Sequence, residues 1–159
     1  MHDALHVPRP EGALSYRSAP FDGLSGRDVH DLLALRSQIF VVEQACVFLD
    51  PDGRDPDAWH VIGRDAAGVI GASARLFLAD APRVEHVIGR VVVHSALRGT
   101  GEGRRLVREA IACAERHGAS PIALSAQAHL ERFYASLGFR AVSERYLLDG
   151  IDHLDMRRG

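Results

Sequence analysis

Residues 98–103 have the residue types of a loop that binds a phosphate group. They read RGTGEG, follow an apolar run that ends in Val91, Val92 and Val93, and precede a stretch with helical spacing. Glycines at 99, 101 and 103 let the backbone come close to a ligand. The helix that follows offers unpaired N–H groups and the positive end of its dipole, which favour an anion. The sequence therefore predicts a polyphosphate site built from main-chain amides.

Two other nucleotide-binding loops carry glycines at similar positions, and the spacing excludes both. A Walker loop needs a lysine after its last glycine, but all 19 basic side chains of this chain are arginines. A dinucleotide-binding loop that started at Gly99 would need a glycine at position 104, where Arg104 stands. The remaining pattern, R-x-x-G-x-G, resembles the acetyl-coenzyme A pyrophosphate loop of the GCN5-related N-acetyltransferase (GNAT) superfamily.

A second segment resembles the same superfamily. Residues 133–139 read FYASLGF, similar to the F/L-Y-x-x-x-G-F segment whose tyrosine hydroxyl lies near the cofactor sulfur. The likeness spans residues 14–158 and is more detailed for the ElaA-like branch. The residues that carry this finer likeness are Phe40, Val41, Val42, Glu43 and Gln44, the loop from Asp50 to Asp55, His60, and Ala126, Gln127, Ala128 and His129.

The resemblance implies where acetyl-CoA, the acetyl donor, would bind. Main-chain amides would hold its pyrophosphate, and the residues that provide them are Arg98, Gly99, Thr100, Gly101, Glu102 and Gly103. Arg98 and Arg104 are candidate charge partners for the phosphate oxygens. The pantetheine arm would pair with the main chain of Val91, Val92 and Val93, as a neighbouring strand would.

The same resemblance implies how the reaction would be assisted. A main-chain N–H near Val93 would stabilise the thioester oxygen as negative charge develops on it. Tyr134 would act as a general acid to the departing thiolate. The alternative interpretation of Tyr134 is a core side chain whose hydroxyl is hydrogen-bonded.

An alkyl ammonium acceptor must lose a proton before it can attack. Only about one in a thousand is neutral at pH 7, which adds roughly 4 to 5 kcal/mol to the barrier unless a base or a dry pocket assists. Candidate bases are Glu43, near the end of a predicted helix, and Glu85 and His86, at the start of a predicted strand. A chain of water molecules is the alternative to a direct base.

The segment from Glu43 to His60 is expected to border the acceptor, since the corresponding region does so in relatives. Glu43, Asp50, Asp52 and Asp55 would suit a cationic substrate, or the aspartates would instead cap turns. His60 and Gln127 complete the predicted substrate-binding set; Gln127 stands where many family members carry asparagine. The histidines show no metal-ligand spacing, so no metal is expected.

Composition limits the classes of protein. With 159 residues, 47% of them hydrophobic, the chain is expected to fold as one domain, residues 14–158, after a loose lead-in at residues 1–13. A net charge of -2 without a long basic run argues against nucleic-acid binding. Cys46 and Cys113 suggest no disulfide framework, and Arg75 interrupts the most apolar stretch, so a cytoplasmic protein without a membrane segment is expected.

The order of predicted elements is β-α-β-β-β-α-β-α-β-β. Strands are predicted at residues 14–17, 58–64, 69–78, 86–93, 121–126, 139–147 and 151–157, and helices at residues 25–42, 101–117 and 130–137. This order predicts an α/β (α+β) fold with a mixed, mostly antiparallel sheet of about seven strands and helices on both faces, which is the fold that the resemblance implies. The strands at 86–93 and 121–126 are expected to separate at their ends.

The sequence thus predicts an acetyl-CoA-dependent N-acetyltransferase that transfers the acetyl group to a primary amine by direct attack in a ternary complex. The acceptor is expected to be a small molecule or a peptide, and exposed strands allow a homodimer. Two alternatives stay open: a non-catalytic acyl-CoA-binding or sensing module, and an acyltransferase that uses a longer acyl-CoA.

Overall fold

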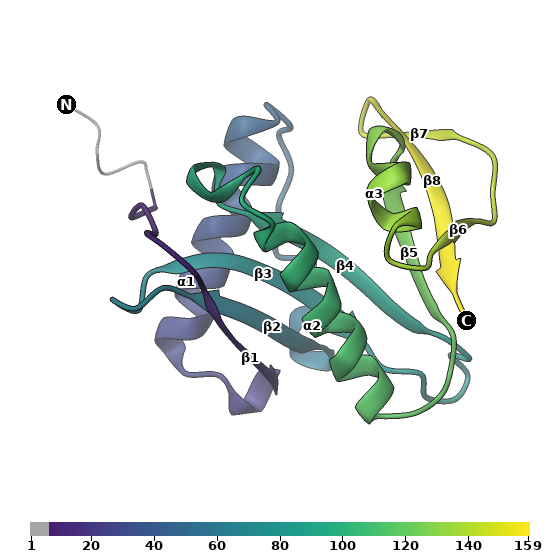
Figure 1. Cartoon of the computed structure of the whole chain (residues 1–159), viewed down its shortest axis with the longest axis horizontal. Helices are drawn as coiled ribbons and strands as arrows, with labels where there is room; N and C mark the ends of the chain where they lie inside the picture. Colours follow the sequence, from purple (N-terminus) through teal and green to yellow (C-terminus); the bar gives the residue numbers. More distant parts are fainter. Residues whose placement is uncertain (1–6) are drawn as a thin grey trace.

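A mixed sheet of eight strands runs through the computed structural model, which describes residues 7–159 (Figure 1). The strand order is β1-β2-β3-β4-β5-β8-β6, and β7 also pairs with β8. The strands are β1 (Ser15–Pro20), β2 (Trp59–Arg64), β3 (Ile70–Phe77), β4 (His86–Val93), β5 (Ile122–Gln127), β6 (Arg140–Ala141), β7 (Tyr146–Leu148) and β8 (Ile151–Arg158). The predicted mixed, mostly antiparallel sheet is confirmed, with eight strands where about seven were expected.

The α-helices that pack on this sheet are α1 (Gly26–Arg36), α2 (Glu102–Arg116) and α3 (Glu131–Ala135). α1 begins with a capping box: the Ser25 hydroxyl accepts from the Asp28 N–H, and the Asp28 carboxylate accepts from the Ser25 N–H. The single helix predicted at residues 25–42 is in fact composite, because a π-helical segment, Ser37–Glu43, continues α1. Such segments occur often at functional sites, and this one brings Glu43 to Arg98 of the glycine loop.

The two faces of the sheet are covered by different helices, because alternate side chains of a strand point to opposite faces. On one face, buried residues such as Val61 of β2 pack with Leu106 of α2 and Tyr134 of α3. On the other face, the next residue of β2, Ile62, packs with Leu35 of α1. α1 therefore lies on the face opposite α2 and α3 (Figure 1).

β4 and β5 are parallel neighbours that stay paired only where they begin. Their register contains two pairs, His86 with Ile122 and Val87 with Ala123. In Figure 1 the two strands meet at the lower right and diverge toward the top. The predicted separation of these strands is therefore present, and it leaves the edges of both strands free at the end nearest the glycine loop.

The strand predicted at residues 139–147 is interrupted. A bend at Ser143 divides it into β6 and β7, and the Ser143 hydroxyl accepts from the Asp155 N–H of β8. Both short strands still pair with β8. Of the predicted lead-in at residues 1–13, residues 1–6 lie outside the described part of the chain, and residues 7–13 contain no helix or strand.

Leu106→Ala tests how strongly α2 is held on the sheet. Leu106 is fully buried, so we expect a loss of about 2–5 kcal/mol in the free energy of unfolding from lost burial and a residual cavity. Arg108→Ala, on the exposed side of the same helix, should change it by less than about 0.5 kcal/mol. Urea denaturation measures both values; similar small losses would contradict the packing described here.

Candidate functional site

The glycine loop precedes α2 and has an open side. Gly99 and Gly101 adopt φ angles of +77° and +89°, and no atom lies within 4 Å of the place where a Cβ would stand at either residue. Such positive φ angles strain residues with a side chain and cost glycine little. Residues 99–101 are all exposed. The loop therefore leaves room for a ligand to approach its backbone closely.

Several main-chain amides of the loop are available to such a ligand. Arg98 and Thr100 donate to carbonyls just before the loop, those of Ser95 and Leu97, at 3.3 and 3.4 Å. The expectation that every amide from residue 98 to 103 faces the ligand is therefore corrected. Amides without a backbone acceptor in residues 7–159 are those of Gly99, Gly101, Glu102, Gly103 and Arg104.

The side chain of Glu102 attaches the glycine loop to the start of β1. It is 5% exposed and accepts hydrogen bonds from the Leu14 N–H at 3.2 Å and the Tyr16 hydroxyl at 2.6 Å. Burial and this carboxylate raise the pKa of Tyr16, so its hydroxyl keeps its proton. The bonds tie the first turn of α2 to β1 and turn the carboxylate inward. The Glu102 amide is therefore free on the loop, while its carboxylate points away from the open side.

The two predicted phosphate partners flank the loop. Arg98 pairs with Glu43 of the π-helical segment. Arg104 donates to the Ser136 hydroxyl at 2.8 Å and lies over the Phe133 ring, 5.9 Å from its centroid. Both guanidinium groups are partly exposed, so each can turn toward an anion in the loop.

Tyr134 lies in the core on the α2 side of the sheet. It is 5% exposed and packs edge-on against Phe133 and Phe139, with ring centroids 5.0 and 6.0 Å away. Its hydroxyl makes no hydrogen bond within residues 7–159 and is not among the buried polar atoms, so the ring is in the core while the hydroxyl is accessible. Burial raises the pKa of Tyr134 to about 12, which keeps the phenol protonated at neutral pH.

A β-bulge at Arg90 and Val91 interrupts β4 at the start of the valines that were expected to pair with the pantetheine arm. Ser73 faces Val92 and Arg75 faces Gly89, so Ala74 of β3 faces two residues of β4. Arg90 sits in the bulge with φ of 48°, a strained value for a residue with a side chain. The predicted oxyanion donor near Val93 thus has a second candidate region, the bulge, which the sequence did not reveal.

The aspartates expected to face a cationic substrate are instead neutralised by arginines. Asp50 is buried between Arg36 and Arg90, with Nε–carboxylate distances of 2.8 and 3.0 Å. Arg75 lies between the other two aspartates, 2.9 Å from Asp52 and 3.1 Å from Asp55.

These ion pairs lower the pKa values of Asp52 and Asp55, and the arginine charges offset the carboxylate charges that a cationic ligand would need. The Arg75 guanidinium holds the pKa of Asp52 well below its usual range. Burial alone would raise the pKa of Asp55, yet Arg36 and Arg75 lower it. Asp52 also caps a turn by accepting from the Arg54 N–H at 3.0 Å. The prediction that Asp50, Asp52 and Asp55 bind the acceptor is therefore corrected: they fasten their loop to the sheet.

The other predicted acceptor residues divide in the same way. His60 is 1% exposed and its Nε2 lies 2.9 Å from the Asp55 carbonyl, so it belongs to the same buried anchor. Burial lowers the pKa of His60, which favours the neutral ring. Gln127 ends β5 at the open end of the gap where β4 and β5 have separated (the split). Glu43 is exposed beside the loop and paired with Arg98. Gln127 and Glu43 thus lie near the opening and the glycine loop, where their part in binding an acceptor stays a prediction, and His60 does not.

Two candidate bases lie at the opposite end of β4 from the glycine loop. His86 is 1% exposed; its Nδ1 accepts from the Ala79 N–H at 2.9 Å, and its Nε2 lies 3.2 Å from the Gly118 carbonyl. Glu85 pairs with Arg157 at 3.1 Å. Because β4 and β5 are still paired at this end, the structure removes Glu85 and His86 from the site. Their position at the start of a strand misled the prediction.

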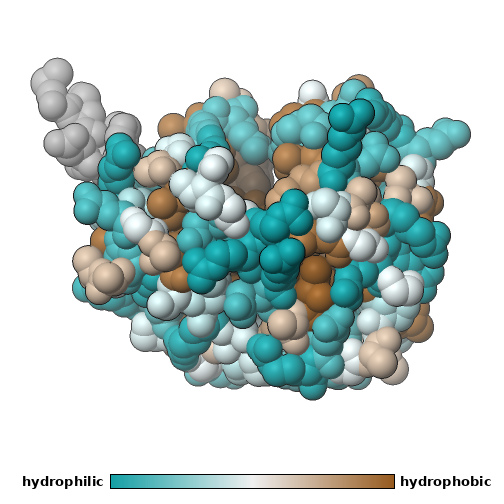
Figure 2. Space-filling model, in the orientation of Figure 1, coloured by the Kyte–Doolittle hydropathy of each residue, from teal (hydrophilic) through white to brown (hydrophobic). Residues whose placement is uncertain are grey.

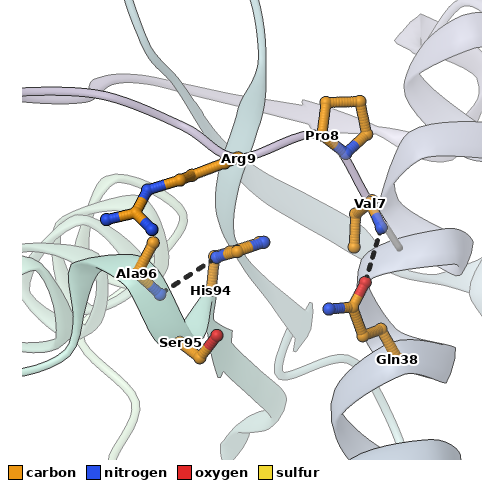
Figure 3. Close-up of a pocket in the computed structure, with 7 residues that line it drawn as sticks. All are labelled: Val7, Pro8, Arg9, Gln38, His94, Ser95 and Ala96. Carbon is orange, nitrogen blue, oxygen red and sulfur yellow. Dashed lines mark hydrogen bonds between the residues drawn. The ribbon is translucent and has the colours of Figure 1, made fainter. Parts of the chain in front are cut away.

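The surface is hollowed where the strands diverge. Figure 2 shows a recess between the two halves of the molecule at the top of the view, with apolar residues at its floor. A separate cavity of about 780 Å³ lies at the end of β4, between the N-terminal segment and the π-helical segment (Figure 3). There the His94 Nδ1 accepts from the Ala96 N–H at 3.0 Å, which fixes the chain as it enters the glycine loop.

Two further observations concern the described residues alone. No helix within residues 7–159 is long and apolar enough to cross a bilayer. Nor do three or more His, Cys, Asp or Glu side chains of this part of the chain gather into a group that could hold a metal ion.

A parallel strand pair that separates beside a glycine-rich helix N-terminus, with a protonated tyrosine next to the opening, defines the fold of the acyl-CoA-dependent acyltransferases. Comparison with known proteins agrees. A family model described as an acetyltransferase (GNAT) domain matches residues 61–158. The chain belongs to this family.

Its relatives place it in the ElaA-like branch. Protein ElaA of Escherichia coli is 41% identical over 138 residues, which cover 85% of this chain and 90% of ElaA. The crystal structure of Escherichia coli ElaA superposes with a TM-score of 0.87 at 38% identity, covering 92% of this chain and 99% of that one. An acyl-CoA N-acyltransferase from Pseudomonas aeruginosa gives the same TM-score, 0.87, at 40% identity, covering 92% and 100%.

Asp50→Ala tests the buried ion pairs. Removing this carboxylate leaves the 1% exposed Arg36 side chain with one partner fewer, so we expect a loss of about 3 kcal/mol or more in the free energy of unfolding. Glu131→Ala, which removes an exposed pair with a 4.0 Å separation, should cost less than about 1 kcal/mol. Equal losses in urea denaturation would show that Asp50 is not held as described.

Proposed function

We propose that this protein is an acetyl-CoA-dependent N-acetyltransferase that transfers the acetyl group to a primary amine by direct attack in a ternary complex. The observation that carries the proposal is the separation of β4 and β5 beside the free amides of the glycine loop. The loop fits a diphosphate because its amides lack acceptors and because it has no Cβ on its open side. The free edge of β4 fits the amide groups of a pantetheine arm.

The residues of the chain would divide the work as follows. Free amides of the loop bind the pyrophosphate, and Arg98 and Arg104 can add charge-assisted bonds to it. Main-chain N–H groups around the β4 bulge stabilise the thioester oxygen. Tyr134 donates a proton to the sulfur of the departing thiol.

Tyr134 also separates this proposal from the alternative of a non-catalytic acyl-CoA sensor. A binding module gains nothing from a protonated phenol that makes no hydrogen bond within residues 7–159. A transferase needs this donor when the thiolate leaves. A longer acyl chain would have to lie along the apolar floor of the recess, and comparing acetyl-CoA with octanoyl-CoA as donors tests this variant.

We also propose that the protein works in the cytoplasm, as a monomer or homodimer, on a small-molecule or peptide amine. Cys46 and Cys113 are both free thiols, as a reducing compartment would keep them.

Gly101→Asp tests whether the glycine loop binds the pyrophosphate. A carboxylate at this position adds bulk and negative charge where the pyrophosphate would lie, so acetyl-CoA binding should weaken at least about 100-fold. Gly68→Asp is the matched control: Gly68 has φ of +84° and, like Gly101 at +89°, no atom within 4 Å of a Cβ, but it lies in the β2–β3 turn. Calorimetry measures the acetyl-CoA affinity of both variants, and equal affinities would show that the glycine loop does not bind the pyrophosphate.

Tyr134→Phe tests the general acid. Turnover should fall about 100-fold or more, because assistance by a general acid contributes on this scale, while acetyl-CoA affinity stays nearly unchanged. Thiol release during amine acetylation gives the turnover, and calorimetry gives the affinity. Since the pKa of Tyr134 is about 12, the wild-type rate should show no loss from its ionisation below about pH 10. Unchanged turnover in the variant would remove Tyr134 from the mechanism.

A further inference from the structure

Polar side chains cover one face of β5 and β8, on the side of the sheet opposite α2 and α3. Leu154 and Met156 of β8 point into the core shared with α2 and α3. Alternation therefore places His153 and Asp155 on the opposite face, the face on which α1 lies. Across the strands, Gln127 is the register partner of His153 and Ser125 is the register partner of Asp155.

This cluster stands at the open end of the split. Gln127 is the last residue of β5, and β4 and β5 have separated by that point. His153 lies beside Gln127 on the next strand, about 4.8 Å further from the opening at the usual spacing of strands. The glycine loop precedes α2 and so lies at the same end of β4. An acyl group that passed through the split from the α2 side would emerge toward the face that carries His153.

The hydrogen bonds of His153 decide which of its ring nitrogens is basic. Its Nδ1 lies 2.7 Å from the Ile151 carbonyl oxygen, which can only accept. Nδ1 must therefore carry the proton, and the lone pair of the neutral ring is on Nε2. Within residues 7–159, Nε2 makes no hydrogen bond and is not among the buried polar atoms. The ring presents a free basic nitrogen to the surface.

The neighbours of His153 hold the ring in place. The Tyr146 ring stacks against it, with centroids 6.2 Å apart and an interplanar angle of 24°. The Tyr146 hydroxyl donates to Asp155 at 2.6 Å and contacts the Ser125 hydroxyl. Burial and the Asp155 carboxylate raise the pKa of Tyr146. The charged side chains that β5 and β8 place on this face are Asp155 and, further along β8, Arg157 in its pair with Glu85. Toward α1, the same side of the sheet carries Asp50 between Arg36 and Arg90.

We propose that His153 is the general base that takes a proton from the ammonium group of the acceptor, with Nε2 as the accepting atom. The inference rests on the proposed function and supplies the base that Glu85 and His86 do not. With His153 as the base, Glu43 can keep its ion pair with Arg98 while the acceptor ammonium is deprotonated.

The protons and bonds balance as follows. Nε2 takes one proton from the alkylammonium, and the freed lone pair forms the C–N bond to the acetyl carbon. The C–S bond breaks, and the thiolate takes a proton from the Tyr134 hydroxyl. The nitrogen of the new amide releases its extra proton, which restores the phenol through solvent, and His153 returns its proton to water. The net products are an N-acetyl amine, the free thiol and one proton.

His153→Asn is the decisive variant. The asparagine amide can still donate to the Ile151 carbonyl in place of Nδ1, but nothing replaces Nε2. The probes are ethylamine, which is almost wholly protonated at pH 7, and trifluoroethylamine, which is nearly the same size and mostly neutral because its fluorines withdraw electrons. With acetyl-CoA as donor, we expect kcat/KM for ethylamine to fall about 100-fold or more and that for trifluoroethylamine to fall less than about threefold.

His30→Asn is the matched control. His30 stands on α1 with its side chain 80% exposed, so this variant should acetylate both amines at the wild-type rate. Nitrogen NMR of the wild type adds a readout that needs no turnover: His153 should show a protonated Nδ1 and a bare Nε2. A ring protonated on Nε2 would overturn the assignment.

The outcomes separate the inference from the function beneath it. Suppose that the wild-type protein acetylates trifluoroethylamine, so that the transferase function stands. His153 is then not the base if its variant shows the same fold-loss of kcat/KM for both amines, or no loss for either. If the wild type transfers to neither amine, the transferase function fails and the inference fails with it.

Discussion

β4 and β5 stay hydrogen-bonded over only two register pairs, and every other part of the site depends on that separation. Unpaired strand edges are costly inside a protein, because their N–H and C=O groups lose water without gaining partners. Here both edges open onto a hollow at the surface, where water or a ligand can satisfy them. A linear ligand with amide groups of its own fits such an opening better than water, since it can pair with the strand edge along its length. The same opening ends at the glycine loop, where free amides meet one end of that ligand.

The separation is held open by packing on both faces. On one face, the short helix α3 lies over β5, and its Tyr134 and the following Phe139 belong to the core shared with α2. On the other, Arg90 stands in the β4 bulge and is held by Asp50, which Arg36 of α1 also binds. Removing a partner from such a buried group is expensive. The strained φ of Arg90 can therefore persist, because the surrounding ion pairs fix its side chain.

Most of the fold and the cofactor side of the site follow from local sequence patterns. The glycine loop, the helical spacing of α2 and the segment around Tyr134 each depend on residues close together in the chain, and the structure has each element in its predicted place. The acceptor side depends on pairs far apart in sequence. Asp50 meets Arg90 across 40 residues, and nothing local distinguishes an aspartate that binds a substrate from one that binds a buried arginine. Arg75, a lone charge in an apolar run, was the one available signal of such a partner. The roles of Glu85, His86 and His153 likewise depend on which end of the split each strand residue reaches.

The two faces of the sheet suit opposite kinds of proton transfer. In the proposed mechanism, a phenol packed among aromatic rings, with a pKa raised to about 12, stays protonated at neutral pH and is the acid for the departing thiolate. An alkyl thiol has a pKa of about 8.5 in water, so this transfer needs a setting in which the thiolate too is poorly solvated. Such a group can give up a proton but cannot take one from a cation. A half-buried imidazole on an open sheet face has the reverse properties: it can take a proton from a cation and pass it to water in each cycle. In this mechanism the separation of the strands would let the two groups act on one reaction centre from opposite faces of the sheet.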